Sequence, residues 1–135
     1  PGSPLGFATV GGVPWIGLPG NPVSTMVCFE LYVRPAIRKM HGHRDLFRRT
    51  VPAVTEEPIK TGGRLTHFLR AVLTETDAGY RARLTGPQGS GILTSMAKAN
   101  ALLIVPEDRN EVPAGSTLSA LLLDDSRSTE HPPLG

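Results

Sequence analysis

The chain has little sulfur, few aromatic side chains and no long apolar run. Its one cysteine, Cys28, excludes an intrachain disulfide and is too little sulfur for a structural zinc site. Aromatic residues make up 5% of the sequence, too few for a platform on which single-stranded nucleic acid would stack. The apolar run at residues 101–105 is far shorter than the roughly 20 residues that span a bilayer. Since no charged-then-apolar leader is recognisable either, we expect a cytoplasmic protein that does not enter a membrane.

The remaining composition is that of a folded domain. Hydrophobic residues make up 39% and charged residues 19% of the 135 residues, which excludes wholesale disorder. The 15 glycines and 13 prolines divide the sequence into short elements. Because the sequence opens at Pro1, inside a motif and not at a methionine, we expect a piece of a longer protein.

The first third of the sequence predicts two short strands and a helix. The strands are expected at residues 5–10 and 14–18, and the second leads into a turn rich in glycine and proline. In that turn Asn21 is placed to cap a helix, and Pro22 suits the first helical turn. The helix is therefore expected over residues 22–41.

This helix is expected to be amphipathic and bent. Glu30, Arg34 and Arg38 recur every four residues as a polar stripe, opposite a broad apolar side. Pro35 lies inside the helix and should bend it, because its ring opposes the carbonyl group of Leu31.

Positive charge is concentrated where the helix ends. The formal net charge of +2 includes six basic residues at positions 34–49, against one acid, Asp45, in the same stretch. A basic segment of this kind attracts phosphate or nucleic acid. The simpler interpretation is a solvated helix end whose cations complement the helix dipole. Charge alone does not decide between the two.

Beyond residue 42 the hydrophobic pattern alternates, which predicts strands. Five strands are expected, at residues 49–55, 68–76, 80–85, 100–105 and 116–123, with a hairpin loop at 77–79 and one or two helical turns at 92–98. Five short strands in so few residues suit a small, mostly antiparallel β-barrel. The expected fold class is mixed α+β: an α/β remnant of two short strands and a kinked helix, followed by a five-stranded barrel.

Few side chains form a recognisable chemical site. The glycine-rich stretch 86–91 lacks the lysine of a P-loop, so an ordinary loop is the simpler interpretation. Arg70 shares its strand face with Phe68 and Val72, where an arginine either extends to the rim or binds an anion. The four histidines have no metal-ligand spacing with one another or with Cys28. The residues by themselves therefore predict no complete active site.

Several motifs resemble a known family. Residues 17–24, which read GLPGNPVS, and the helix segment 29–36 closely resemble the molybdopterin molybdenumtransferases, the MoeA-type insertases related to the E domain of gephyrin. The likeness continues through residues 63–65, 68–70, 86–91 and 97–101, and it ends with residues 112–123. It covers nearly the whole chain up to Asp125.

The resemblance implies a domain order and an activity. Residues 1–45 match the end of the family's third, molybdopterin-binding domain, residues 46–125 match its fourth, barrel domain, and residues 126–135 are expected to be a flexible tail. Family enzymes are homodimers that use Mg²⁺ to insert molybdate into adenylylated molybdopterin and release AMP. The family's cleft acids precede Pro1. We therefore expect the 135 residues alone to be inactive, with no catalytic or metal-binding residue among them.

The resemblance also implies contacts with the substrate. The substrate-binding residues that it implies are Pro19, Gly20, Asn21, Pro22, Arg70 and Ser90. The four turn residues match the loop that lines the family's pterin cleft. Arg70 is expected to pair with phosphate or molybdate oxygens, and Ser90 to donate a hydrogen bond. Ser3 stands where the family has the second lysine of a Lys-Pro-Gly-Lys-Pro motif, which should weaken anion binding.

Two other functions remain open. Gephyrin-like relatives use the same fold as a scaffold that binds a partner peptide, without catalysis. The second is a basic barrel that binds nucleic acid. It is disfavoured, because the positive charge lies at the helix end and not on the strands. An unaccompanied third-domain remnant should expose Trp15, Val27 and Phe29, which would favour association.

Overall fold

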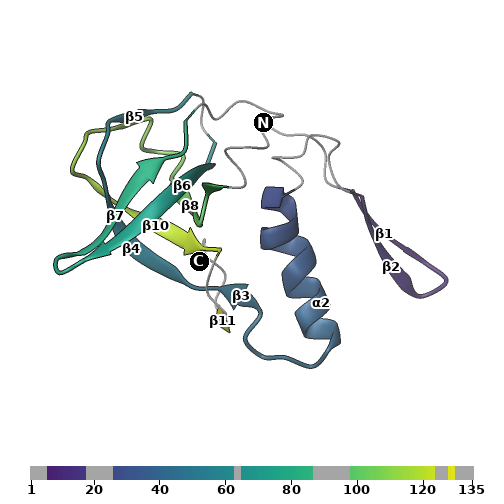
Figure 1. Cartoon of the computed structure of the whole chain (residues 1–135). Coiled ribbons are helices and arrows are strands. Elements are labelled where there is room, and N and C mark those ends of the chain that lie inside the picture. The colour runs from purple at the N-terminus through teal and green to yellow at the C-terminus, as the bar shows by residue number, and fades with distance from the viewer. Residues whose placement is uncertain (1–5, 18–25, 63–64, 87–97, 124–127, 130–135) are drawn as a thin grey trace.

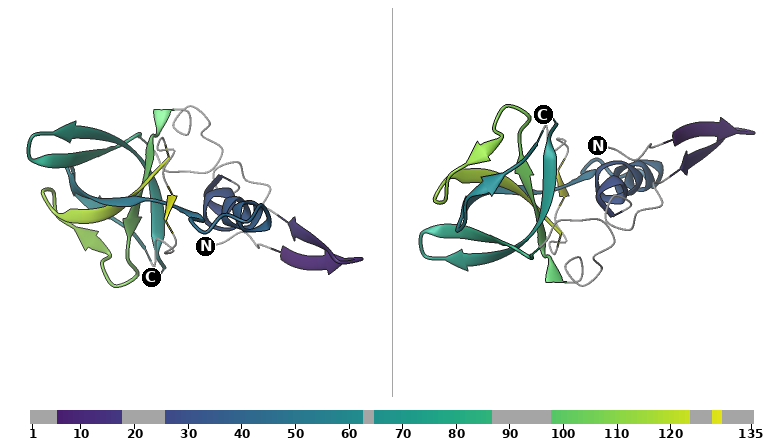
Figure 2. Two further views of the ribbon diagram at one scale, coloured as in Figure 1. Left: turned by 90° about the horizontal axis from the view of Figure 1, so that it is seen from below. Right: turned by 90° about the horizontal axis from the view of Figure 1, so that it is seen from above.

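The molecule consists of a β-barrel, a helix and a β-hairpin, with the helix between the other two (Figure 1). The computed structural model describes residues 6–17, 26–62, 65–86, 98–123 and 128–129. Views from below and from above show the same order, with the hairpin directed away from the barrel (Figure 2). The mixed α+β fold expected from the sequence is thereby confirmed.

Five strands close into a barrel in the order β10-β4-β7-β6-β8. They are β4 (Thr50–Thr55), β6 (His67–Thr76), β7 (Gly79–Leu84), β8 (Ala101–Val105) and β10 (Thr117–Leu122). All five were expected, and their ends differ from the expected ones by no more than one residue. Four pairings are antiparallel, and the fifth, between β4 and β7, is parallel.

The barrel is narrow inside, and alanine fills its tightest positions. Each strand contributes one alanine that is at most 1% exposed: Ala53, Ala71, Ala82, Ala101 and Ala120. Five strands enclose less space than the eight that leave an interior just wide enough for side chains, so small residues are needed where the strands approach most closely. Larger residues such as Leu73, Leu103 and Leu118 fill the rest of the core.

A short strand pair completes the barrel core. β5 (Ile59–Lys60) pairs with β9 (Glu111–Val112), and the apolar member of each strand is buried, 5% exposed for Ile59 and 1% for Val112. Both side chains belong to the same core cluster as the barrel strands. The sequence did not predict these strands, because two residues are too few to show an alternating pattern.

A second short pair of strands connects the residues just before β4 with the C-terminal segment. β3 (Phe47–Arg48) pairs antiparallel with β11 (Ser128–Thr129). Both residues of β11 fall in the segment that was expected to be a loose tail, so this part of the segment has regular backbone pairing. The expected helical turns at 92–98 lie outside the described residues except for Lys98.

The helix contains a widened turn next to its internal proline. It is described from Met26 and passes through a π-helical turn, η1 (Phe29–Val33), into α2 (Arg34–Met40). The backbone N–H of Arg34 donates to the carbonyl oxygen of Phe29, which is the π-helical register. The wider turn lies immediately before Pro35, where a regular helix would bring the proline ring against a carbonyl group. The sequence predicted a bend at Pro35, and the structure has a π-helical turn just before this proline.

The helix ends where the sequence predicted. Gly42 has a φ of +83°, a left-handed conformation that glycine adopts without strain. No helix in the described part of the chain is long and apolar enough to cross a membrane.

The N-terminal hairpin pairs β1 (Gly6–Val10) with β2 (Val13–Gly17). Every residue of the two strands is exposed except Ile16, which is partly buried. No charged side chain occurs among residues 6–17. The hairpin therefore presents apolar side chains to solvent.

Candidate functional site

Arg70, the described member of the expected ligand residues, lies where β6 changes partner strands. Residues 67–71 of β6 pair with β8, and residues 71–76 pair with β7. Arg70 stands opposite Leu102 of β8, one residue before the change. The remaining expected ligand residues, Pro19, Gly20, Asn21, Pro22 and Ser90, lie outside the described residues, as does Ser3.

The side chain of Arg70 lies on the outer face of the barrel. Leu69 and Ala71 on either side pack in the barrel core, so strand alternation directs Arg70 outward. Arg70 is nevertheless only 1% exposed and is the largest fully buried residue described. The interpretation in which the arginine extends to the rim is therefore wrong.

The outer face around Arg70 is apolar and buried. Leu102 pairs with Arg70 on one side and with Leu121 of β10 on the other, and these two leucines are 0% and 1% exposed. Neither leucine belongs to the inner core cluster. All five residues of β8 are buried. The unbroken apolar run of residues 101–105 was the signal for this second buried layer, since a strand buried on both faces loses its alternation.

Burial also determines the electrostatics of Arg70. Removal of solvent disfavours the charged form, and this lowers the pKa of the Arg70 guanidinium from its ordinary value. Because an arginine pKa starts so high, the group stays cationic at neutral pH. A charge in such surroundings interacts more strongly with an anion than it would in water. The arrangement is suited to holding a phosphate or oxoanion, provided that the anion reaches the guanidinium.

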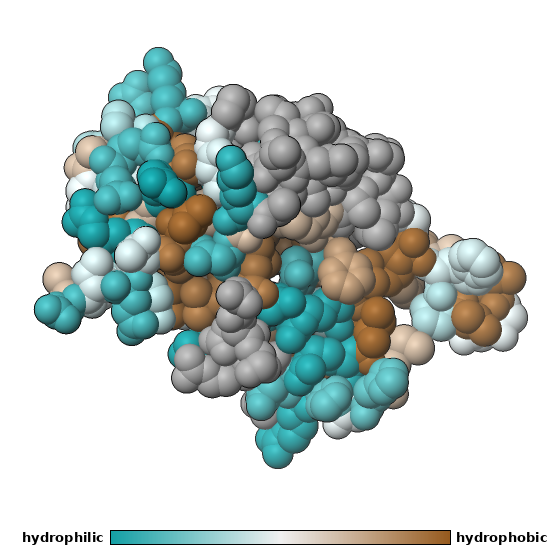
Figure 3. All heavy atoms as spheres, in the orientation of Figure 1, coloured by the Kyte–Doolittle hydropathy of each residue, from teal (hydrophilic) through white to brown (hydrophobic). Residues whose placement is uncertain are grey.

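The polar stripe of the helix faces the chain that follows it. Arg34 Nη1 donates to the carbonyl oxygen of Leu46 at 3.4 Å, and Arg38 Nε donates to that of Asp45 at 2.8 Å. Figure 3 shows hydrophilic residues on the side of the helix toward the barrel and hydrophobic residues toward the hairpin. The helix end is exposed at residues 39–45, as the simpler interpretation expects, and two of its arginines also bond to the connecting segment.

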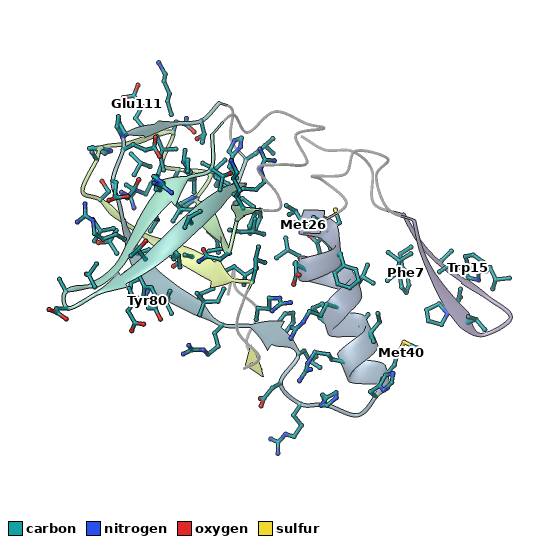
Figure 4. All side chains as sticks on the ribbon, in the orientation of Figure 1. Phe7, Trp15, Met26, Met40, Tyr80 and Glu111 are labelled. Atoms are coloured by element: carbon teal, nitrogen blue, oxygen red, sulfur yellow. The ribbon has the colours of Figure 1, made fainter. Side chains whose placement is uncertain are left out.

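An apolar groove lies between the hairpin and the helix. Phe7 points from the hairpin toward α2, whereas Trp15 points to the opposite side of the hairpin (Figure 4). The groove has a volume of about 630 Å³ and is lined largely by Phe7, Pro14, Ile16, Val33, Ile37 and Met40. Trp15 is 61% and Phe29 39% exposed, which confirms the exposure expected for them, whereas Val27 is partly buried.

Metal ligands are not gathered in the described part of the chain. No three His, Cys, Asp or Glu side chains among the described residues are close enough to hold a metal ion. Cys28 is half-buried, and this burial raises the pKa of its thiol. Of the histidines, His67 is engaged through Nε2 with the carbonyl oxygen of Gly62, at 2.9 Å.

Fold and site together define a small barrel module that carries a buried arginine on its outer face and follows a helix and hairpin with an apolar surface. The family model of the MoeA C-terminal region (domain IV) matches residues 52–123. The chain therefore belongs to the MoeA C-terminal domain family.

Relatives with assigned names agree with this family. A protein of Mycobacterium tuberculosis named molybdopterin molybdenumtransferase 2 is 41% identical over 87% of this chain and 29% of its own length. A molybdopterin molybdenumtransferase of Staphylococcus aureus is 32% identical over 97% of this chain and 31% of its own length. The chain thus spans about 30% of the length of these relatives.

Solved structures show the same fold. A molybdopterin biosynthesis MoeA protein from Pyrococcus horikoshii superposes with a TM-score of 0.72 at 25% identity, over 93% of this chain and 30% of that one. A molybdenum cofactor biosynthesis protein from Pyrococcus furiosus gives a TM-score of 0.62 at 30% identity, over 76% and 36% of the two chains.

Proposed function

We propose that this chain is the C-terminal part of a molybdenum insertase, which inserts molybdate into adenylylated molybdopterin during molybdenum cofactor biosynthesis. The observation that carries the proposal is the match of the barrel to the MoeA C-terminal domain. The names of the relatives, molybdopterin molybdenumtransferases, support the reaction. Because the chain spans only about 30% of their length, the 135 residues alone are expected to be inactive.

In this proposal Arg70 is a substrate-binding residue. The desolvated guanidinium on the outer face of the barrel pairs with a phosphate or molybdate oxygen. This role requires the outer layer to admit the anion, since Arg70 is enclosed in the chain as it stands. The turn of Pro19, Gly20, Asn21 and Pro22, together with Ser90, completes this wall of the pterin cleft.

The remaining parts of the site are proposed to come from outside the chain. The acids that handle Mg²⁺ and molybdate precede Pro1 in the longer protein, which works as a cytoplasmic homodimer. The described residues provide no metal cluster of their own. In this division the barrel contributes binding and orientation of the substrate, while the preceding domains contribute the metal chemistry.

The test of the Arg70 role uses the longer protein with two substitutions. Arg70→Lys keeps the positive charge but loses the planar, two-pronged donor set, and Arg70→Met keeps only the apolar volume. We expect molybdate-dependent AMP release to fall in both variants, and to fall further with Met. Unchanged turnover in Arg70→Met would remove Arg70 from the substrate site. Arg83→Met is the control, because Arg83 is an exposed residue of the same hairpin.

A further inference from the structure

The strand ends that meet at Arg70 are held by two side chains. Thr85 follows the last residue of β7, and both its backbone N–H and its Oγ1 donate to the carbonyl oxygen of Arg70, at 3.2 and 3.4 Å. The pairing of β7 with β6 is thereby extended from Ala71 to Arg70. One peptide oxygen receives two donors, so the backbone of Arg70 is fixed from the β7 side.

Asn100 bonds to β6 on the β8 side, at Ala71 and Leu73. Its side-chain Oδ1 accepts from the N–H of Leu73 at 2.7 Å, and its Nδ2 donates to the carbonyl oxygen of Leu73 at 3.2 Å. The amide group thus replaces a peptide unit opposite Leu73, since it carries the same donor and acceptor. The backbone N–H of Asn100 also donates to the carbonyl oxygen of Ala71 at 3.1 Å. This extends the pairing of β6 with β8 to the residue before the start of β8.

Asn100 also connects three strands. Its carbonyl oxygen accepts from the N–H of Leu123, just beyond β10, at 2.9 Å. The residue therefore uses its backbone and its side chain to join β6 and β10 at the start of β8. Thr85 is bonded to β6 at Arg70, and Asn100 is bonded to it at Ala71 and Leu73.

We propose that Asn100 and Thr85 are positioning residues for Arg70, an inference that rests on the anion-binding role proposed above for Arg70. β6 has no single partner strand across the junction, because its pairings with β8 and β7 overlap only at Ala71. Arg70 stays paired with Leu102 of β8, and each of the two residues bonds β6 along an edge where a neighbouring strand has ended: Thr85 beyond β7 at Arg70, and Asn100 beyond β8 at Leu73. A shift on the order of 1 Å at a binding group is enough to cost about a hundredfold in rate.

The experiment compares four variants of the longer protein. Asn100→Ala removes both bonds to Leu73, Asn100→Asp keeps only the acceptor, and Thr85→Val keeps the shape but loses the hydroxyl. Leu118→Ala is the matched control. It opens a cavity in the core from β10 and touches none of the bonds at Arg70. The measured quantities are kcat, the KM for molybdate and the melting temperature.

We expect the KM for molybdate to rise on the order of tenfold in Asn100→Ala, with a smaller change in kcat. Asn100→Asp and Thr85→Val should show smaller increases. Leu118→Ala should lower the melting temperature and leave KM unchanged. An unchanged KM in Asn100→Ala, or an equal rise in Leu118→Ala, would overturn the proposal, because the effect would then be absent or due to stability alone.

A second readout separates this proposal from the function on which it rests. In the ¹⁵N-labelled chain, the Arg70 Nε–H resonance reports the position of the guanidinium whether or not molybdate binds there. If Arg70→Met leaves turnover intact, the anion-binding role fails, and the positioning role is judged from this resonance alone. A shift in Asn100→Ala and Thr85→Val but not in Leu118→Ala supports it. If the resonance is unchanged in both Asn100→Ala and Thr85→Val, the positioning role is overturned.

Discussion

The carboxylate of Glu30, in the π-turn of the helix, forms an ion pair with the guanidinium of Arg48, in β3. The two residues lie 18 positions apart in the sequence. Their side chains are only 11% exposed for Glu30 and 18% for Arg48. Arg34 and Arg38 also bond to the carbonyl oxygens of Leu46 and Asp45. Together with the ion pair, these bonds hold the helix against the segment that leads into β4. The helix and the barrel are therefore joined by polar contacts.

Removal of one partner of this pair should destabilise the molecule. We expect Glu30→Gln to lower the free energy of unfolding by about 1–3 kcal/mol, because a partly buried guanidinium loses its charged acceptor. Glu56→Gln is the matched control, since the Glu56–Arg81 pair is 42% and 49% exposed and exposed pairs contribute about 0–1 kcal/mol. Urea titrations of both variants make the comparison. Equal losses would show that the Glu30–Arg48 pair does not hold the helix in place.

The buried volume of Arg70 predicts an order of stability among its variants. Arg70→Ala should lower the free energy of unfolding by about 2–5 kcal/mol, because it leaves a cavity in the outer layer. Arg70→Met should lose less, since methionine fills most of the space with an apolar chain. Arg83→Ala, at an exposed position, should stay within about 0.5 kcal/mol of the parent. Equal losses in Arg70→Ala and Arg83→Ala would mean that Arg70 is solvated in solution.

Much of the fold was predictable because most of its strands have one solvent-exposed face and one buried face. β7 is the clearest case. Its inward residues Tyr80, Ala82 and Leu84 alternate with the exposed Arg81 and Arg83, as the sequence pattern indicated. The burial of Arg70 was not predictable in this way. Strand alternation gives the face of a side chain, but it does not say whether a second layer covers that face.

The surroundings of Cys28 predict slow thiol chemistry. Burial raises the pKa of this thiol above its ordinary value, so less thiolate is present at a given alkaline pH than in an exposed cysteine. Alkylation by iodoacetamide at pH 8 should therefore be slower in the folded chain than in the same chain in urea. Equal rates would contradict the burial of Cys28.

The raised pKa of the Cys28 thiol also makes the stability of the folded chain depend on pH. A thiol whose pKa is raised by folding contributes stability below the pKa of the unfolded state, and this contribution is lost as the pH rises through the folded pKa. The stability of the parent chain should thus decline more on the alkaline side than that of Cys28→Ser. Parallel pH profiles for the two chains would argue against the shift.

The hairpin between β6 and β7 depends on a glycine. Gly79 has a φ of +114°, a backbone conformation that residues with a side chain rarely adopt. Nothing lies within 4 Å of the place where a Cβ would stand. We expect Gly79→Ala to lower the free energy of unfolding by about 1–3 kcal/mol through backbone strain alone. Gly62→Ala, also in open space but without a positive φ, should be nearly neutral. Equal effects at the two glycines would contradict this conformation.

The hydrogen bonds of Asn100 and Thr85 to β6 could not be predicted from the sequence, for a different reason. Asn100 precedes a strand, and Asn is common wherever a strand begins, so its spacing carries no sign of a partner. The bond to Leu73 exists because β6 leaves β8 at that point, which is a property of barrel closure and not of local sequence. The π-turn at Phe29–Val33 is intermediate, since Pro35 predicted a bent helix but not a π-helical turn.

The insertase function is tested most directly by AMP release from the longer protein. Adenylylated molybdopterin would be incubated with that protein and with the 135-residue chain, each with and without molybdate. We expect molybdate-dependent AMP release by the longer protein and none by the 135 residues. No release from a folded longer protein would contradict the insertase function, and release by the 135 residues alone would contradict the assignment of the metal-handling acids to the preceding domains.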